Sequence, residues 1–178
     1  MSQGVREERQ RPAFVADERT QLVGWLDVQR EIVRWKCEGL SDEDAHRALI
    51  PPSPLMTVAG VVSHLRWAEH LWFEVSFLGG AIEGPEFEEG PNGEELDNDW
   101  RVEGVPLSQL LEDYRLQCER SNEIIAAHSL DDVGRGTGWP SAGSTLRWML
   151  HHMLEETARH AGHLDIIREL LDGQKGYY

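Results

Sequence analysis

The feature of this sequence that most constrains its fold is a helical spacing of apolar residues in four separate segments. In each segment apolar side chains recur at steps of three and four residues, with charged side chains between them. That period is typical of an α-helix with one buried face. We expect helices over residues 17–38, 57–78, 108–128 and 145–172 and find neither a convincing strand alternation nor an internal repeat. Four helices of about 20 residues, each about 30 Å long, predict an all-α four-helix bundle.

Capping residues predict where several of these helices begin and end. Thr57 is a candidate N-cap for the second helix, and Ser144 or Thr145 for the fourth. Gly39 and Gly173 are plausible C-terminal stops. Ser41 with Asp44 resembles a capping box, which predicts a short extra helix over residues 41–48 between the first and second long helices. The prolines at positions 51, 52 and 54 then forbid regular structure.

The remaining segments set the domain organisation. Residues 1–16 are charged with little apolar content, so we expect a flexible N-terminal arm followed by one bundle domain over residues 17–178. Residues 79–106 form a long connection rich in Gly, Pro, Asp and Glu. A connection of this length is functional, disordered, or a crossover between distant helix ends, so the topology need not be simple up-and-down. Its acidic stretch, residues 83–95, either covers a site or is merely solvated.

The charge of the chain excludes two classes of partner. The formal net charge is −15, which argues against binding to nucleic acid and against electrostatic docking on an anionic membrane. No apolar run approaches the roughly 20 residues that span a bilayer, and the polar N-terminus is unlike a secretory signal. Two cysteines, Cys37 and Cys118, do not make a disulfide framework. A cytoplasmic location is the expected default.

A histidine cluster on the fourth helix is the main candidate for chemistry. With His152 set at 0°, Glu156 lies at about 40°, His160 at about 80° and His163 at about 20°, so all four share one stripe. Side chains four residues apart on one helical face can ligate one ion. The spacing fits either His152 with Glu156 or Glu156 with His160, and His64 on the second helix is a natural third ligand. A lone histidine on an apolar face is more often a satisfied core residue, so the spacing alone leaves the metal site open.

Three motifs give this pattern a family resemblance. Residues 57–65 read Thr-Val-Ala-Gly-Val-Val-Ser-His-Leu, continued by Trp67-Ala68-Glu69 and Trp72-Phe73, and residues 156–163 read Glu-Thr-Ala-Arg-His-Ala-Gly-His. Leu164-Asp165 and Arg168-Glu169 follow, and Thr145-Leu146-Arg147-Trp148 precedes them. Over roughly residues 20–173 the chain resembles the DinB-like superfamily of four-helix metal proteins. It is most similar to the actinobacterial branch that includes mycothiol-dependent enzymes.

The resemblance implies a ligand set of His64, Glu156 and His160. Many members of the superfamily have histidine where this chain has Glu156, whereas glutamate there is similar to the mycothiol-using branch. Many members also read His-x-Gly-Gln, while this chain has His163 in place of the glutamine. We therefore do not expect His163 to be a ligand, and we take His163 and Arg159 as candidates to act on protons or on substrate.

Two nitrogens and one oxygen leave at least one coordination position open, which is typical of catalytic sites. Zinc is the first choice of metal, with nickel, iron or manganese as other candidates. The resemblance implies that a low-molecular-weight thiol such as mycothiol binds through sulfur and attacks a small electrophile, in S-transfer or isomerisation. Related bundles often pair through helix faces, so a homodimer is plausible.

Two other functions stay open at this level. The chain can instead be a metal-binding bundle without turnover that binds a small ligand or a partner, for example in a stress response. A two-histidine, one-carboxylate set also fits an Fe(II) oxygenase. Trp100, Trp139 and Trp148 are candidates to line a pocket, or are ordinary core residues.

Overall fold

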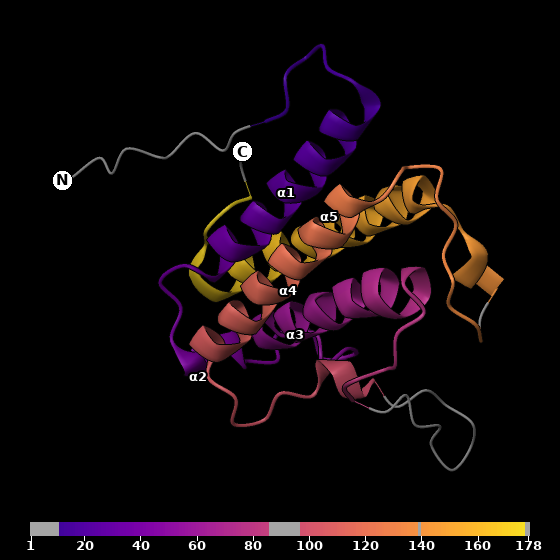
Figure 1. Cartoon of the computed structure of the whole chain (residues 1–178). Coiled ribbons are helices and arrows are strands. Elements are labelled where there is room, and N and C mark those ends of the chain that lie inside the picture. Colours follow the sequence, from indigo (N-terminus) through magenta and orange to yellow (C-terminus); the bar gives the residue numbers. More distant parts are fainter. Residues whose placement is uncertain (1–10, 86–96, 139, 177–178) are drawn as a thin grey trace.

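The computed structural model describes residues 11–85, 97–138 and 140–176, and it is built from helices (Figure 1). The long elements are α1 (Glu18–Cys37), α3 (Val58–Glu69) continued by the π-helix η1 (His70–Phe77), α4 (Leu107–Ala127) and α5 (Leu146–Asp172). Short elements are α2 (Asp42–Ala45) and the 3₁₀ turns η2 (Asn98–Trp100) and η3 (Pro140–Gly143). Among the described residues there is no strand, only an isolated bridge between Val133 and Thr145. The predicted all-α four-helix bundle is confirmed.

Side-chain caps explain where three of the long helices begin. Asp17 accepts from the backbone N–H of Thr20, Thr57 from that of Gly60, and Thr145 from that of Trp148. Each cap satisfies one backbone donor that has no partner within its helix. Of the two candidate caps for α5, the structure selects Thr145. The helix ends at Gly173, whose φ of +76° is the left-handed conformation that glycine adopts without strain.

The short helix after α1 is half as long as the sequence suggests. Ser41 is its N-cap, as expected, but the helix ends at Ala45 rather than at residue 48. The chain leaves the helix at His46, the C-cap residue, whose ring nitrogens lie 2.8 Å from the carbonyl of Asp42 and 3.2 Å from that of Val102 in the long connection. The helix also anchors the end of the long connection, because Asp42 Oδ1 accepts a 2.8 Å hydrogen bond from the N–H of Leu107.

The order of helix directions explains the long connection. In Figure 1, α3 with η1 runs from the α2 end of the bundle to the opposite end, and α4 runs the same way beside it. The chain must therefore return along the bundle between Phe77 and Leu107. The end of η1 and the start of α4 lie at opposite ends of the bundle, so residues 79–106 join distant helix ends, which is one of the three possibilities for this segment. Most of its acidic stretch, residues 86–95, lies outside the described residues, as do residues 1–10 of the N-terminal arm.

The second long helix changes its winding halfway. A single helix was expected over residues 57–78, but the α-helix stops at Glu69 and a π-helix follows from His70 to Phe77. Residues 71–73 and 75–78 are nearly all apolar, so the sequence there shows no clear 3.6-residue period. Without that period, the sequence cannot distinguish an α-helix from a π-helix. The π-helix is held at its end by the loop after α4. The N–H groups of Arg135 and Gly136 donate to the carbonyls of Phe77 and Ser76, each at 2.9 Å.

The core forms two apolar clusters with a charged layer between them. One cluster contains Val33, Leu65, Tyr114 and Leu164, and the other contains Leu26, Phe73, Ile125 and Met149, among other residues. The guanidinium of Arg30 reaches Glu69 through two hydrogen bonds of 2.7 Å, and both side chains are buried. No helix in the described part of the chain combines the length and apolarity needed to cross a membrane.

Candidate metal centre

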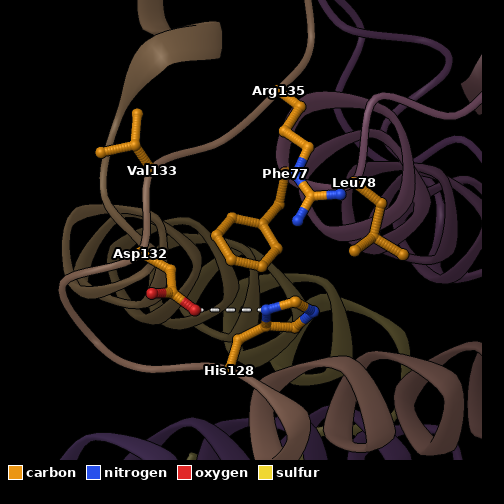
Figure 2. Close-up of a pocket in the computed structure, with 6 residues that line it drawn as sticks. All are labelled: Phe77, Leu78, His128, Asp132, Val133 and Arg135. Atoms are coloured by element: carbon orange, nitrogen blue, oxygen red, sulfur yellow. Dashed lines mark hydrogen bonds and ion pairs between the residues drawn. The ribbon is translucent and has the colours of Figure 1, made fainter.

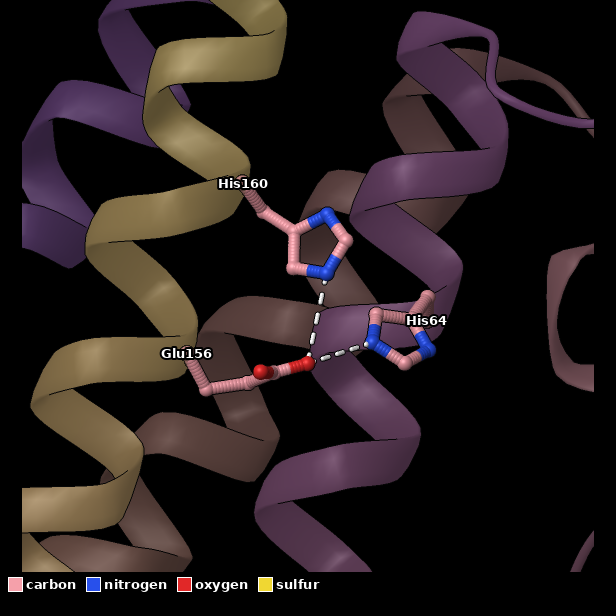
Figure 3. A group of neighbouring side chains, drawn as sticks. All are labelled: His64, Glu156 and His160. Atoms are coloured by element: carbon pink, nitrogen blue, oxygen red, sulfur yellow. Dashed lines mark hydrogen bonds and ion pairs between the residues drawn. The ribbon is translucent and has the colours of Figure 1, made fainter. Parts of the chain in front are cut away.

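Three side chains from two helices converge in the bundle, His64 from α3 and Glu156 and His160 from α5 (Figure 3). Glu156 Oε1 lies 3.0 Å from Nε2 of His64 and 3.2 Å from Nε2 of His160. One ligand atom from each residue falls within 4.8 Å of the other two. The side chains are 18%, 14% and 7% exposed, so the group is recessed but reachable from solvent.

Helix geometry explains why these side chains meet. Glu156 and His160 are four residues apart on α5, so they stand one turn apart on one face. α3 packs against the same face and presents His64 to both. The residue spacing allowed two pairs of metal ligands on α5, His152 with Glu156 or Glu156 with His160. The structure selects Glu156 with His160.

His64 is fixed from its other side by the end of the long connection. Its Nδ1 lies 2.6 Å from Oδ2 of Asp99, and its ring stacks on Trp100 with centroids 4.3 Å apart. Ser63 Oγ donates to the backbone carbonyl of Asp99 at 2.6 Å, which holds η2 against α3. Trp100 is a pocket candidate from the sequence, whereas Asp99 is not among the candidates. No spacing signal marks Asp99, because it is one of many acidic residues in a long connection.

The electrostatics of the group follow from these contacts. Burial alone would lower the pKa of His64, but hydrogen bonds with Asp99 and Glu156 outweigh it and raise that pKa above its ordinary value of 6.5. Hydrogen bonds with His160 and His64 lower the pKa of Glu156 far below its ordinary value. Burial, with the nearby charges of His160 and Arg159, lowers the pKa of His163. Glu156 is therefore a carboxylate at neutral pH.

The donor set fits a divalent cation. His64 stands between two carboxylates, and both accept hydrogen bonds only, so its ring must carry two protons or have a cation in place of the proton on Nε2. In a tetrahedral zinc site with bonds of about 2.0–2.1 Å, neighbouring ligand atoms lie roughly 3.3 Å apart. The separations of 3.0 and 3.2 Å from Glu156 Oε1 are close to that spacing. Little movement is needed for these residues to share one ion.

Comparison with known proteins identifies the family. The family model described as mycothiol-S-transferase matches residues 21–173. The chain belongs to this family. No curated protein and no solved structure gave a match. The resemblance to the DinB-like superfamily expected from the sequence is thus confirmed, and the three motifs that carried it lie within the matched range.

Other residues that the sequence singled out lie around the group. Within this mycothiol-S-transferase family member, His163 Nδ1 is 3.2 Å from Nδ1 of His160, and Arg159 Nη1 is 3.6 Å from Oε2 of Glu156. His163 is partly exposed and Arg159 is 57% exposed. Both side chains therefore border the group without belonging to it. Trp139 lies outside the described residues.

His152 shares the stripe on α5 but does not join the group. Its ring packs instead against two indoles, 4.4 Å from Trp72 and 5.4 Å from Trp148 between centroids. Trp148 is 46% exposed and His152 is 29% exposed. A partly exposed aromatic surface thus begins one helical turn from Glu156.

Proposed function

We propose that this protein is a metal-dependent transferase that joins the sulfur of a low-molecular-weight thiol, such as mycothiol, to a small electrophile. The observation that carries the proposal is the convergence of His64, Glu156 and His160 in a chain of the mycothiol-S-transferase family. These three residues are the proposed ligands. Zinc is the proposed metal, with nickel, iron and manganese as competitors for the same site.

The proposed site keeps a position for the thiol. Three protein ligands fill three of the four positions that zinc prefers, as in catalytic zinc sites. When bound, the cation supplies the positive charge that lowers the pKa of a sulfhydryl group, so that sulfur is a nucleophile at neutral pH. A sulfur–carbon bond then forms, the thiol proton passes to solvent, and the leaving group departs from the electrophile.

The protein's own thiols do not fit the role of nucleophile. Cys37 and Cys118 are free but buried, and burial raises the pKa of each to about 12. Such thiols carry almost no thiolate at neutral pH. The sulfur that reacts must therefore come from a substrate. Two buried, unpaired cysteines also suit the cytoplasm, which we propose as the location.

The residues around the group have separate proposed roles. Asp99 accepts from Nδ1 of His64 and so leaves Nε2 to face the cation. His163, whose lowered pKa keeps it neutral, is placed beside His160 to accept or deliver a proton. Arg159 stands at the exposed rim and is placed to hold an anionic group of either substrate.

The aromatic surface beside the group suits the electrophile. His152 lies one turn from Glu156 on α5, and its ring packs against Trp148, one further turn away, and against Trp72 of η1. Aromatic rings of this kind bind small apolar bodies by surface burial. We propose that the electrophile rests there while its reacting carbon faces the thiol.

The first experiment measures metal content. Elemental analysis of protein purified without chelators is expected to give one first-row divalent ion per chain, and His64→Ala and Glu156→Gln are expected to lose it. The control is His151→Ala, because His151 is an exposed histidine on the same helix and its Nδ1 lies 2.8 Å from the carbonyl of Arg147, away from the three proposed ligands. A wild-type chain without stoichiometric metal contradicts the proposal.

The second experiment measures turnover. Metal-loaded protein with mycothiol and a bimane or chloro-nitroaromatic probe is expected to release conjugate, whereas His64→Ala is not. Stoichiometric metal without conjugate from any of several low-molecular-weight thiols would instead favour a non-catalytic metal-binding bundle. Iron-loaded protein that consumes oxygen would favour an oxygenase. The proposed homodimer is tested separately by light scattering.

A further inference from the structure

A cavity lies at the C-terminal end of η1, away from the three converging side chains. Its volume is about 220 Å³, and it is lined by Phe77, Leu78, His128, Asp132, Val133 and Arg135 (Figure 2). None of these residues belongs to the group of His64, Glu156 and His160. The cavity is therefore a separate feature that the proposed transfer reaction does not use.

The backbone around this cavity is held firmly. The N–H groups of Arg135 and Gly136 donate to the last carbonyls of η1, and Gly134 donates to Ser144 at 2.9 Å. A Cβ at Gly136 would stand 2.8 Å from backbone atoms of Val75 and Ser76, so the loop and the π-helix touch backbone to backbone. The position from which the Arg135 side chain starts is thus fixed by main-chain contacts.

The polar groups in the cavity favour an anion. Figure 2 shows the guanidinium of Arg135 extending towards the rings of Phe77 and His128. Arg135 is exposed, and within the described part of the chain its guanidinium has no ion-pair partner, although the chain as a whole carries a net charge of −15. The carboxylate of Asp132 is engaged already, 3.3 Å from Nδ1 of His128 and 3.0 Å from the N–H of Ser129.

The apolar side chains of the cavity favour an anion that carries a hydrocarbon group. The Phe77 ring is buried and meets His128 edge to face, with centroids 5.0 Å apart, and Leu78 also lines the space. Val133 is exposed, and Figure 2 shows its side chain directed away from these rings. An apolar cavity of about 150 Å³ is large enough for benzene. A space of about 220 Å³ therefore has room for a ring with one carboxylate.

We propose that this cavity binds a small organic monocarboxylate with an aromatic or branched apolar body. The carboxylate pairs with the guanidinium of Arg135, whose planar donors match its two oxygens. The apolar body rests against Phe77 and Leu78. The carboxylate of Asp132 stays with His128 and does not compete for Arg135.

The test is a titration with benzoate, followed by chemical shifts of backbone amides and by calorimetry. Saturable shifts are expected in residues 76–79 and 128–136. Benzamide, which has the same shape without the charge, is expected to bind far more weakly. Arg135→Gln should weaken benzoate binding about tenfold to a hundredfold, the loss expected when a charged hydrogen-bonding partner is removed.

Two further variants test whether benzoate occupies the cavity itself. Leu78→Trp enlarges a side chain that lines the space and should weaken binding, whereas Arg47→Gln, an exposed arginine near α2, should leave it unchanged. Benzoate could also bind a metal held by His64. Binding that survives His64→Ala supports the cavity, whatever the outcome for the transferase. Binding lost in His64→Ala but kept in Arg135→Gln overturns the inference, and so does equal binding of benzamide or no saturation.

Discussion

Asp99 and Glu156 hold His64 between them, with Oδ2 of Asp99 2.6 Å from Nδ1 and Oε1 of Glu156 3.0 Å from Nε2. Asp99 comes from the end of the connection that crosses the bundle, and Glu156 comes from the middle of α5. The contact with Asp99 directs the remaining nitrogen of the imidazole towards the proposed ion. Asp99, in the 3₁₀ turn η2 of the connection, thus orients His64, whereas the proposed ligands all lie on α3 and α5.

Replacing Asp99 should weaken metal binding without removing a ligand. Asp99→Asn is expected to lower the affinity for zinc about 10- to 100-fold, as observed for residues that orient metal-binding histidines. Competition with a chromophoric chelator measures this affinity. Asp97→Asn is the matched control, because Asp97 is exposed and its side chain makes no capping hydrogen bond. Equal affinities in the two variants would show that Asp99 has no orienting role.

Arg159 should affect substrate binding more than metal binding. Arg159→Gln is expected to keep a stoichiometric ion and to raise KM for an anionic thiol about threefold to tenfold, with kcat little changed, because the side chain stands at the rim. Steady-state kinetics and elemental analysis on one preparation measure both. Loss of the ion would mean that Arg159 supports Glu156 rather than the substrate.

The buried pair between Arg30 and Glu69 should dominate the stability of the middle of the bundle. Glu69→Gln removes the buried carboxylate and leaves the buried guanidinium with Asp27 as its ion-pair partner at 2.8 Å, so unfolding by urea is expected to show a loss of about 3 kcal/mol, the lower end for a broken buried pair. Replacing both residues with apolar ones of similar volume should recover most of that loss. Glu112→Gln breaks an exposed pair with Arg115 and should change stability little.

Glu74 should contribute to stability in a pH-dependent way. Burial raises its pKa, but hydrogen bonds with Gln117 and His70 and the charge of Arg120 outweigh burial and lower the pKa below its ordinary value of 4.5. The contribution of Glu74 is then fully present above pH 4.5 and is lost as pH falls through the lowered pKa of the folded state.

Urea unfolding at several pH values tests this sign. The destabilisation caused by Glu74→Gln should be largest at neutral pH and shrink below pH 4.5. The control is Glu103→Gln, at an exposed position without an ion pair to any residue that the structure describes. A gap between wild type and Glu74→Gln that grows on acidification would contradict the assigned direction.

Two glycine substitutions should have opposite effects on stability. Gly162→Ala lies on the exposed face of α5, where an added Cβ meets nothing within 4 Å, and should stabilise the protein by about 1 kcal/mol. Gly136→Ala would place its Cβ 2.8 Å from the backbone of η1 and should destabilise it by about 1–3 kcal/mol. Thermal unfolding of the two variants measures the difference. Equal effects would show that the loop can move away from η1.

Local signals in the sequence located the helices well. Asp17, Thr57 and Thr145 cap their helices because a side-chain oxygen within three residues of a free N–H acts without help from distant parts of the chain. The switch to a π-helix after Glu69 could not be read in the same way. It coincides with a buried contact to Arg30 on another helix and with bonds from the loop at residues 135–136.

The sequence by itself determined that this chain is a helical bundle and placed Glu156 and His160 on one face of one helix, because both results depend on spacing along a single segment. The family resemblance implied that His64 joins that pair, and the tertiary structure brings the three side chains together. Only the tertiary structure decided that His152 turns to the indoles of Trp72 and Trp148 and that Asp99 reaches the site. Those outcomes depend on how α3, α5 and the crossover pack together. Contacts between segments far apart in the chain leave no periodic mark in the sequence.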